Sequence, residues 1–165
     1  MPPRRAAVIQ LRSTPDPEHS VARALFWAHE SVERGADLVL LPENYAGIPA
    51  AGEASRLHGI GDRLLDCPAV APFIELSRRC PATFVLGGLP VVGPAGTHNT
   101  CLVVHAGVVA ARYAKMHLFD GALPDGSRLG ETDKVRRGEE LVVVEGPWGV
   151  LGLSICYDLR FPELY

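Results

Sequence analysis

The chain has 165 residues, of which 47% are hydrophobic and 21% charged, and its formal net charge is -3 at pH 7. This composition is typical of one globular domain, so we expect a single domain over residues 1–165. The weak charge gives no electrostatic footprint for nucleic acid or an anionic membrane, and no apolar run approaches the roughly 18 residues of a membrane span. The start of the chain lacks a signal-peptide core, so we expect a cytoplasmic protein without nucleic-acid or membrane partners.

The first forty residues predict a βαβ unit. Residues 6–11 are mostly apolar and indicate a buried strand. Asp16 can cap the following helix, Pro17 suits its first position, and apolar residues recur at helical spacing until Gly35, which can end it. Residues 37–41 indicate a second apolar strand. Because such crossovers are right-handed, the two strands should be parallel.

The rest of the chain predicts one more long helix and five more strands. Residues 44–65 are expected to form a loop with a short helix from about Glu53, and 121–138 a polar, Gly-rich loop that is too long for a simple turn. A helix is expected again after residue 160, with Pro162 in its first turn. The expected second helix covers 68–79, and the expected strands cover 83–88, 98–104, 108–113, 141–145 and 150–155.

Three chemically active side chains follow three of the expected strands. Cys156 ends the last strand, Glu43 follows the second and Lys115 follows the strand over 108–113. A single cysteine in such a place is more often a core residue. In open α/β sheets, however, ligands bind at the carboxyl edge, and an acid and a base at neighbouring strand ends favour a nucleophilic role for the thiol.

The four cysteines show no Cys-x-x-Cys spacing, and we expect all of them to be thiols. A metal site built from His98, Cys101 and His105 is disfavoured, because His98 and His105 are an odd number of residues apart and would point to opposite faces of one strand. We therefore expect neither a metal nor a cofactor.

Three short motifs carry a resemblance to a known family. They are Leu-Pro-Glu-Asn around Glu43, Lys-Met-His-Leu-Phe-Asp from Lys115, and Cys-Tyr-Asp-Leu-Arg-Phe-Pro-Glu-Leu from Cys156. In this order they resemble the nitrilase superfamily of carbon-nitrogen hydrolases, most closely its Nit-type, omega-amidase-like branch. The resemblance implies an α/β fold, the α-β-β-α sandwich of the nitrilase type, and a Glu-Lys-Cys triad that hydrolyses a small amide.

The resemblance also implies a role for each residue of the site. Glu43 would take the thiol proton, and Cys156 would attack the amide carbon to give a thioester. Lys115 and the backbone N–H of Tyr157 would stabilise the oxyanion. A second glutamate is frequent sixteen residues after the lysine of this family, and Glu131 stands at that spacing, followed by Thr132 as in the family pattern.

The substrate-binding residues are less constrained by the sequence. Arg160 is a candidate for binding a substrate carboxylate, although an ion pair with Asp158 or Glu163 is at least as consistent with the pattern. Asn44 and Tyr45 are candidates for the pocket because they follow the base directly.

Two other readings remain open at this stage. Isochorismatase-like cysteine hydrolases also place a cysteine and a lysine on an α/β sheet, but they pair them with an aspartate, and here the acid is Glu43. The chain could also be an inactive fragment with a role in association. Relatives continue past the position of Tyr165, so we expect a sandwich that is incomplete at the C-terminus, with an exposed sheet face, and a homo-oligomer at full length.

This last expectation gives a prediction. Residues 1–165 alone should release ammonia from small omega-amides far more slowly than a chain extended to family length. The missing half would brace the helix expected after Cys156 and cover the second sheet, and orientation errors of about 1 Å cost about 10²-fold in rate. Ammonia release from succinamate or glutaramate, with Cys156→Ala as control, measures this. Comparable Cys156-dependent turnover in both chains would contradict it.

Overall fold

The computed structural model describes residues 4–48, 64–122, 126 and 128–165. The short helix expected from about Glu53 lies outside these residues. The elements are β1 (Ala6–Val8), α1 (Pro17–Glu33), β2 (Leu38–Leu40), η1 (Leu64–Asp66), α2 (Ala71–Arg79), β3 (Thr83–Gly93), β4 (Gly96–His105), β5 (Val108–Ala114), β6 (Asp120–Ala122), β7 (Arg128–Gly130), β8 (Val143–Gly146), β9 (Gly149–Gly152), η2 (Cys156–Arg160) and η3 (Pro162–Leu164).

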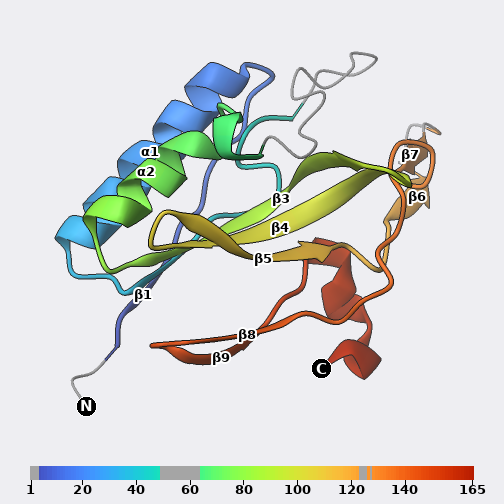
Figure 1. The fold of residues 1–165 in the computed structure, drawn as a ribbon. Coiled ribbons are helices and arrows are strands. Elements are labelled where there is room, and N and C mark those ends of the chain that lie inside the picture. The colour runs from blue at the N-terminus through green and yellow to red at the C-terminus, as the bar shows by residue number, and fades with distance from the viewer. Residues whose placement is uncertain (1–3, 49–63, 123–125, 127) are drawn as a thin grey trace.

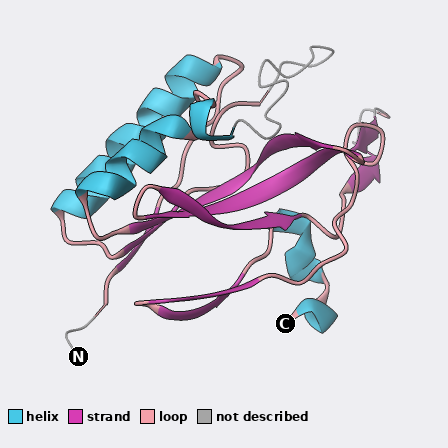
Figure 2. Ribbon diagram, in the orientation of Figure 1, coloured by secondary structure: helices cyan, strands magenta, loops and turns pink. Residues whose placement is uncertain are grey.

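The elements pack in three layers (Figure 1). Helices α1 and α2 cover one face of a five-stranded sheet with the order β1-β2-β3-β4-β5, and the β8–β9 hairpin lies on the other face. Figure 2 shows the same arrangement by type of secondary structure, with both α-helices on one side of the strands. The α/β class is confirmed, and the helix-sheet-sheet order is that of three layers of the expected sandwich.

Strand direction decides which residues share an edge of this sheet. β1, β2 and β3 are parallel, which confirms the expected βαβ unit, whereas β4 is antiparallel to both β3 and β5. β5 therefore runs in the same direction as β2. As a result, Glu43 just after β2 and Lys115 just after β5 leave the sheet at the same edge.

Local chemistry explains the first helix as predicted. The side chain of Asp16 accepts hydrogen bonds from the backbone N–H groups of Glu18 and His19, at 3.0 and 3.3 Å, and Pro17 opens the helix. Its apolar stripe packs with that of α2 on the sheet, where Phe73 of α2 is fully buried. A second cluster of buried side chains joins the opposite sheet face to the β8–β9 hairpin.

Several boundaries differ from the sequence-based expectations. The last expected strand ends at Gly152, and the turns that follow, η2 and η3, are 3-10 helices in place of an α-helix. β6, which starts at Asp120, pairs with β7 where a loop over 121–138 was expected. Each of these strands has three residues, too few to give a periodic signal. β3 extends to Gly93 because it continues to pair with β4 beyond a bulge between Leu86 and Leu89.

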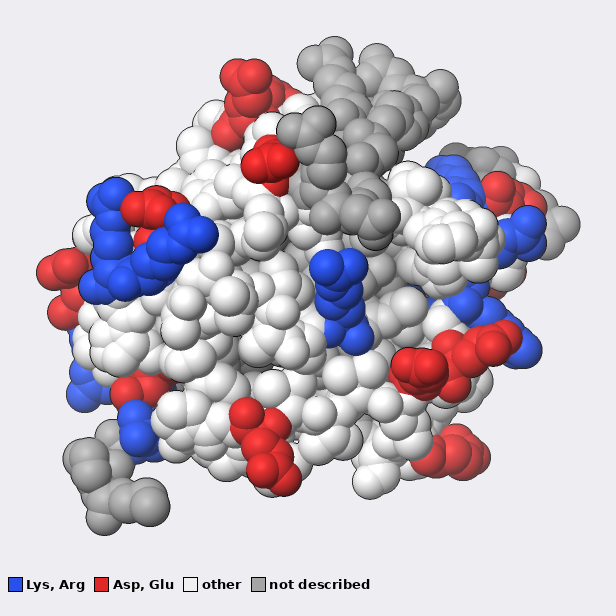
Figure 3. Space-filling model, viewed as in Figure 1, with Lys and Arg blue, Asp and Glu red and all other residues white. Residues whose placement is uncertain are grey.

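The surface carries charges of both signs. On the face in Figure 3, acidic and basic side chains are interspersed, so this face has no extended field of one sign. The outer side of the β8–β9 hairpin exposes Val143 and Val150, as expected for a sheet face that the described residues leave uncovered. Neither described α-helix has the length and apolar character needed to cross a membrane.

Candidate active site

Glu43 is placed by a segment that continues β2 alongside β3. The backbone N–H of Leu41 donates to the carbonyl of Val85 at 2.9 Å, and that of Asn44 donates to the carbonyl of Gly88 at 2.8 Å. Since these two bonds flank Glu43, its carboxylate has a fixed starting point at the sheet edge.

Lys115 lies between two carboxylates. Its Nζ is 2.9 Å from Oε1 of Glu43 and 2.8 Å from Oε2 of Glu131, and the side chain is only 1% exposed. Burial alone would lower the pKa of this ammonium group, but the hydrogen bonds to Glu131 and Glu43 outweigh it and raise the pKa. Lys115 is therefore a cation at neutral pH.

Glu131 is held by the segment that follows the lysine. Its carboxylate accepts the backbone N–H of Phe119 at 2.7 Å, and its own N–H donates to the carbonyl of Phe119 at 3.0 Å. Next to it, the hydroxyl and N–H of Thr132 donate to Asp120 at 2.7 and 3.2 Å. The sixteen-residue spacing predicted from the lysine thus brings Glu131 directly onto Lys115.

Cys156 opens η2 with a left-handed backbone, at φ 46°. Partial burial of the thiol is the largest cause that raises its pKa, followed by the charge of Glu43 and a hydrogen bond to it, while Lys115 opposes them. The surroundings of Cys156 therefore favour the protonated thiol in the resting site. The thiol is neutral at pH 7 and stands beside a base.

Asp158 fixes the turn that carries the cysteine. Its fully buried carboxylate accepts four hydrogen bonds: from the hydroxyl of Tyr113 (2.6 Å), the N–H of Ile155 (2.9 Å), and the N–H and Nδ1 of His117 (2.9 and 2.8 Å). Burial acts to raise the pKa of Asp158, but these donors, Tyr113 first, outweigh it and lower the pKa. A carboxylate thus ties the Cys156 turn to the segment that carries Lys115.

Aromatic rings make a second connection between the same two segments. The ring of His117 stacks on that of Phe161, with centroids 3.7 Å apart and planes at 10°. Tyr157 contacts Phe161 and Phe119 edge to face, at 5.4 and 5.1 Å. Tyr157, the residue after Cys156, is therefore packed between the lysine and cysteine motifs.

Of the two residues predicted to line the pocket, Asn44 lies beside Glu43 and Tyr45 lies in the core. Tyr45 as a pocket residue is wrong, because it is fully buried and its hydroxyl donates to the carbonyl of Ala69 at 2.8 Å. Asn44 lies beside Glu43 with φ 58° and, in the described residues, makes its hydrogen bonds through its backbone.

Arg160 is exposed at the end of η2. Within the part of the chain that the structure describes, its side chain makes no hydrogen bond or ion pair. The alternative of an ion pair with Asp158 or Glu163 is therefore wrong, and the guanidinium is available to an anion from solution.

Sequence reasoning missed Asn99 as a member of the site, and it considered Asp158 only as one possible partner of Arg160. Asn99 in β4 donates from Nδ2 to Glu43 at 2.7 Å and to Glu131 at 3.3 Å. Its position in the apolar strand over 98–104 was the available signal, since a buried amide there needs polar partners.

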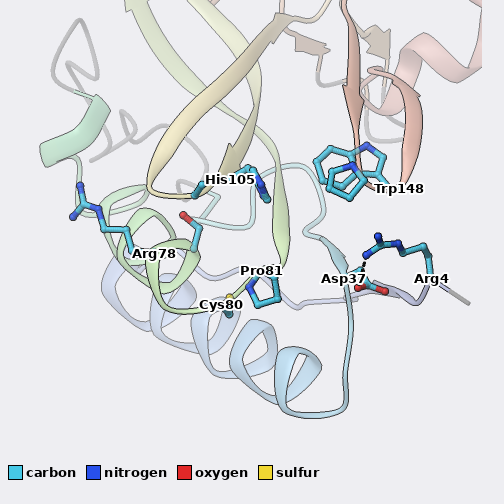
Figure 4. Close-up of a pocket in the computed structure, with 10 residues that line it drawn as sticks. Arg4, Asp37, Arg78, Cys80, Pro81, His105 and Trp148 are labelled. Atoms are coloured by element: carbon cyan, nitrogen blue, oxygen red, sulfur yellow. Dashed lines mark hydrogen bonds and ion pairs between the residues drawn. The ribbon is translucent and has the colours of Figure 1, made fainter. Parts of the chain in front are cut away.

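Two hollows in the described chain are formed by residues outside this cluster. The first, of about 530 Å³, is at the opposite sheet edge, where Asp37 precedes β2, Pro81 precedes β3 and His105 ends β4 (Figure 4). His105 and Trp148 face each other there, with ring centroids 5.9 Å apart. The second, of about 580 Å³, lies between β4, β5 and residues 136–142. Neither is lined by Glu43, Lys115 or Cys156.

Comparison with known proteins defines the family. Residues 5–165 match the model of the carbon-nitrogen hydrolase family, so the chain belongs to that family. It is 38% identical over 172 residues to a deaminated glutathione amidase of Synechocystis sp. (strain PCC 6803 / GT-S), covering 100% of this chain and 61% of the relative. It is 30% identical over 165 residues to human omega-amidase, covering 97% of this chain and 57% of the enzyme.

The fold comparison agrees with the sequence comparison. The crystal structure of the Caenorhabditis elegans NitFhit protein matches with a TM-score of 0.81 and 34% identity, over 96% of this chain and 39% of that one. The resemblance to the nitrilase superfamily is confirmed, and the isochorismatase-like alternative is wrong. The chain spans about 60% of the length of the two curated relatives.

We predict that Cys156 is the first of the four cysteines to be alkylated by iodoacetamide, because it is exposed, whereas Cys80 is half-buried and Cys67 and Cys101 are buried. The midpoint of its pH profile should lie above the ordinary value of about 8.5, and Glu43→Gln should lower it by removing a negative charge. Mass spectrometry at a series of pH values measures both. The raised pKa of Cys101, about 12, makes that thiol an internal control. An unchanged pH profile of Cys156 alkylation in Glu43→Gln would contradict the prediction, because it would mean that Glu43 does not affect the pKa of the thiol.

A second prediction concerns Asp158→Asn. The amide presents a donor to groups that are themselves donors, so the free energy of unfolding should fall by roughly 3 kcal/mol. Because the pKa of Asp158 is lowered in the folded state, its contribution to stability is complete above the unfolded pKa near 3.9 and is lost as pH falls through the folded value. Urea unfolding between pH 3 and 7 measures this, with exposed Asp133→Asn as the matched control. Equal stability of the two variants at pH 7 would contradict the prediction.

Proposed function

We propose that this chain supplies the nucleophile, base and oxyanion donors of an amidase that converts a small amide to a carboxylic acid and ammonia. The observation that supports this most directly is the convergence of Glu43, Lys115 and Glu131 beside the thiol of Cys156. A base, a buried cation and a nucleophile within one site are the groups that acyl transfer requires.

In the first half of the reaction, Glu43 takes the proton of Cys156 as the sulfur attacks the amide carbon. The C=O bond becomes a C–O⁻ bond in the tetrahedral intermediate. Glu43 then gives the proton to the amide nitrogen, the C–N bond breaks, and ammonia leaves a thioester on Cys156.

In the second half, Glu43 takes a proton from water, and the hydroxide attacks the thioester carbon. The C–S bond breaks, the proton returns to the sulfur, and the carboxylic acid leaves. Atoms and protons balance over the cycle without a cofactor.

The oxyanion of both intermediates would be held by Lys115 and the backbone N–H of Tyr157. An ammonium group has three donors, and Glu43 and Glu131 occupy two of them, which leaves one for the substrate. The N–H of Tyr157 donates to no other group of the described chain. Loss of one such donor costs about 10² to 10³ in rate.

We further propose that the substrate amide carries a carboxylate at its other end, which Arg160 binds. The support is the exposed guanidinium on the turn that starts with Cys156, together with the names of the relatives, an omega-amidase and a deaminated glutathione amidase. The cytoplasmic location, the single domain and the homo-oligomer expected from the sequence stay predictions.

The test compares ammonia release from succinamate and glutaramate with release from the uncharged butyramide. Cys156→Ala should abolish turnover of all three, because it removes the sulfur on which the proposed thioester forms. Arg160→Gln should raise KM for the two charged amides by about 10-fold or more, as expected for loss of a charge-assisted pair, and leave butyramide unchanged.

Arg23→Gln is the matched control, since Arg23 is an exposed arginine on α1, on the helix face of the sheet. Turnover that survives in Cys156→Ala would overturn the proposed nucleophile. A KM that rises equally for all three amides in Arg160→Gln would overturn the assignment of the carboxylate site.

A further inference from the structure

Asn99 is a polar residue buried in the middle of the charged cluster. It lies in β4 opposite Pro90 of β3 and is 8% exposed. Its Nδ2 donates to Oε1 of Glu43 at 2.7 Å and to Oε1 of Glu131 at 3.3 Å. One neutral amide thus bridges the two carboxylates that also flank Lys115.

The bridge closes a ring of hydrogen bonds. Lys115 Nζ joins Oε1 of Glu43 to Oε2 of Glu131 on one side, and Asn99 Nδ2 joins the same two carboxylates on the other. The two carboxylates are like charges that repel each other, and without a further donor both would turn toward the single ammonium group of Lys115. The amide gives each of them a second donor in a fixed direction.

The ring has a consequence for the base. Oε1 of Glu43 accepts from both Asn99 and Lys115, so rotation about the terminal torsion of Glu43 is restricted. The hydrogen bonds of the Glu43 side chain with Asn99 and Lys115 all involve Oε1 and leave out its other oxygen, Oε2.

The backbone around Asn99 is shaped to hold its side chain in place. The carbonyl of Asn99 accepts the N–H of Lys115 at 2.8 Å. Across the bulge in β3, a Cβ on Gly88 would stand 2.0 Å from Oδ1 of Asn99, and the three atoms nearest to it all belong to Asn99. Gly88 therefore provides the space that the amide occupies.

Asn99 is also costly to the fold. Its Oδ1 is buried and has no hydrogen-bond partner in the described structure, and an unsatisfied acceptor of this kind costs about 1–3 kcal/mol. If the side chain at this position only filled space, an apolar side chain would give a more stable fold. The amide is explained by what its Nδ2 donates to.

We propose that Asn99 is a positioning residue, which holds Glu43 and Glu131 on the two sides of Lys115 so that the free oxygen of Glu43 faces Cys156, and that Gly88 makes its place. The proposal rests on the proposed function, because it gives Glu43 the role of the base.

The first test compares Asn99→Ala with Asn99→Asp. Aspartate keeps the shape but removes the donor and adds a third carboxylate, so kcat for succinamate should fall at least as far as in the alanine variant, by about 10²-fold, with KM nearly unchanged. Filling space is the competing role, and it would make alanine the more damaging change. A smaller loss in Asn99→Asp than in Asn99→Ala overturns the proposal.

The second test is a double-mutant cycle with Gly88→Ala. This change should lower kcat as Asn99→Ala does, and it should cost little more in the Asn99→Ala background, because the three atoms nearest to the added Cβ all belong to the Asn99 side chain. Gly152→Ala in β9, where a Cβ meets no atom within 4 Å, is the matched control. Additive losses from Gly88→Ala and Asn99→Ala overturn the proposal.

A third measurement needs no amide turnover, so it separates this inference from the proposed function. Glu43, Lys115 and Glu131 are the charged groups that face the Cys156 thiol. In Asn99→Ala, Glu43 is released and the midpoint of Cys156 alkylation should move down toward that of an ordinary cysteine, whereas in Asn99→Asp the added charge should move it up. If the parent chain releases no ammonia, the proposed function fails while these opposite shifts still support the inference. Shifts in one direction, or none, overturn it.

Discussion

A buried ammonium group is the constraint on which this structure depends. Lys115 is almost fully buried, and an unpaired charge in such a place costs several kcal/mol. Its partners Glu43 and Glu131 are 72 and 16 residues away along the chain, so the fold must bring three segments to one point. The parallel β1-β2-β3 unit followed by the β4–β5 hairpin does this, because it makes β2 and β5 end at the same edge.

The cysteine reaches this point through a second buried charge of opposite sign. Asp158 accepts a hydrogen bond from His117 in the lysine segment and another from the N–H of Ile155 in the cysteine segment. Ile155 directly precedes Cys156, which has a left-handed backbone. The lysine motif thus contributes contacts as well as a cation: His117 binds Asp158, and Asp120 binds Thr132 beside Glu131. The motifs are therefore joined to one another and to the Glu131 segment by side-chain hydrogen bonds.

The sequence predicted the parts of this site that depend on local pattern. Apolar strands with Glu43, Lys115 and Cys156 after them are local features, and the βαβ unit fixes their direction. Asn99 carried a local signal, as an amide in an apolar strand, but its partners could not be assigned from it, because they depend on how β4 pairs with β3 beyond the bulge between Leu86 and Leu89. Tyr45 was misplaced for a related reason: adjacency to Glu43 says nothing of the turn at Asn44, which directs the ring into the core against Phe73.

The charges of the cluster also explain why a neutral thiol is compatible with nucleophilic chemistry. With Glu43 and Glu131 counted as carboxylates and Lys115 as an ammonium, the cluster carries a formal net charge of about -1. Loss of the Cys156 proton to solvent would add a second net negative charge in a partly buried place, which is unfavourable and raises the pKa of the thiol. Transfer of that proton to Glu43 leaves the net charge unchanged. In the proposed reaction, ionisation of the sulfur is therefore favoured only when the proton stays within the site, and the same proton is then available to the departing ammonia.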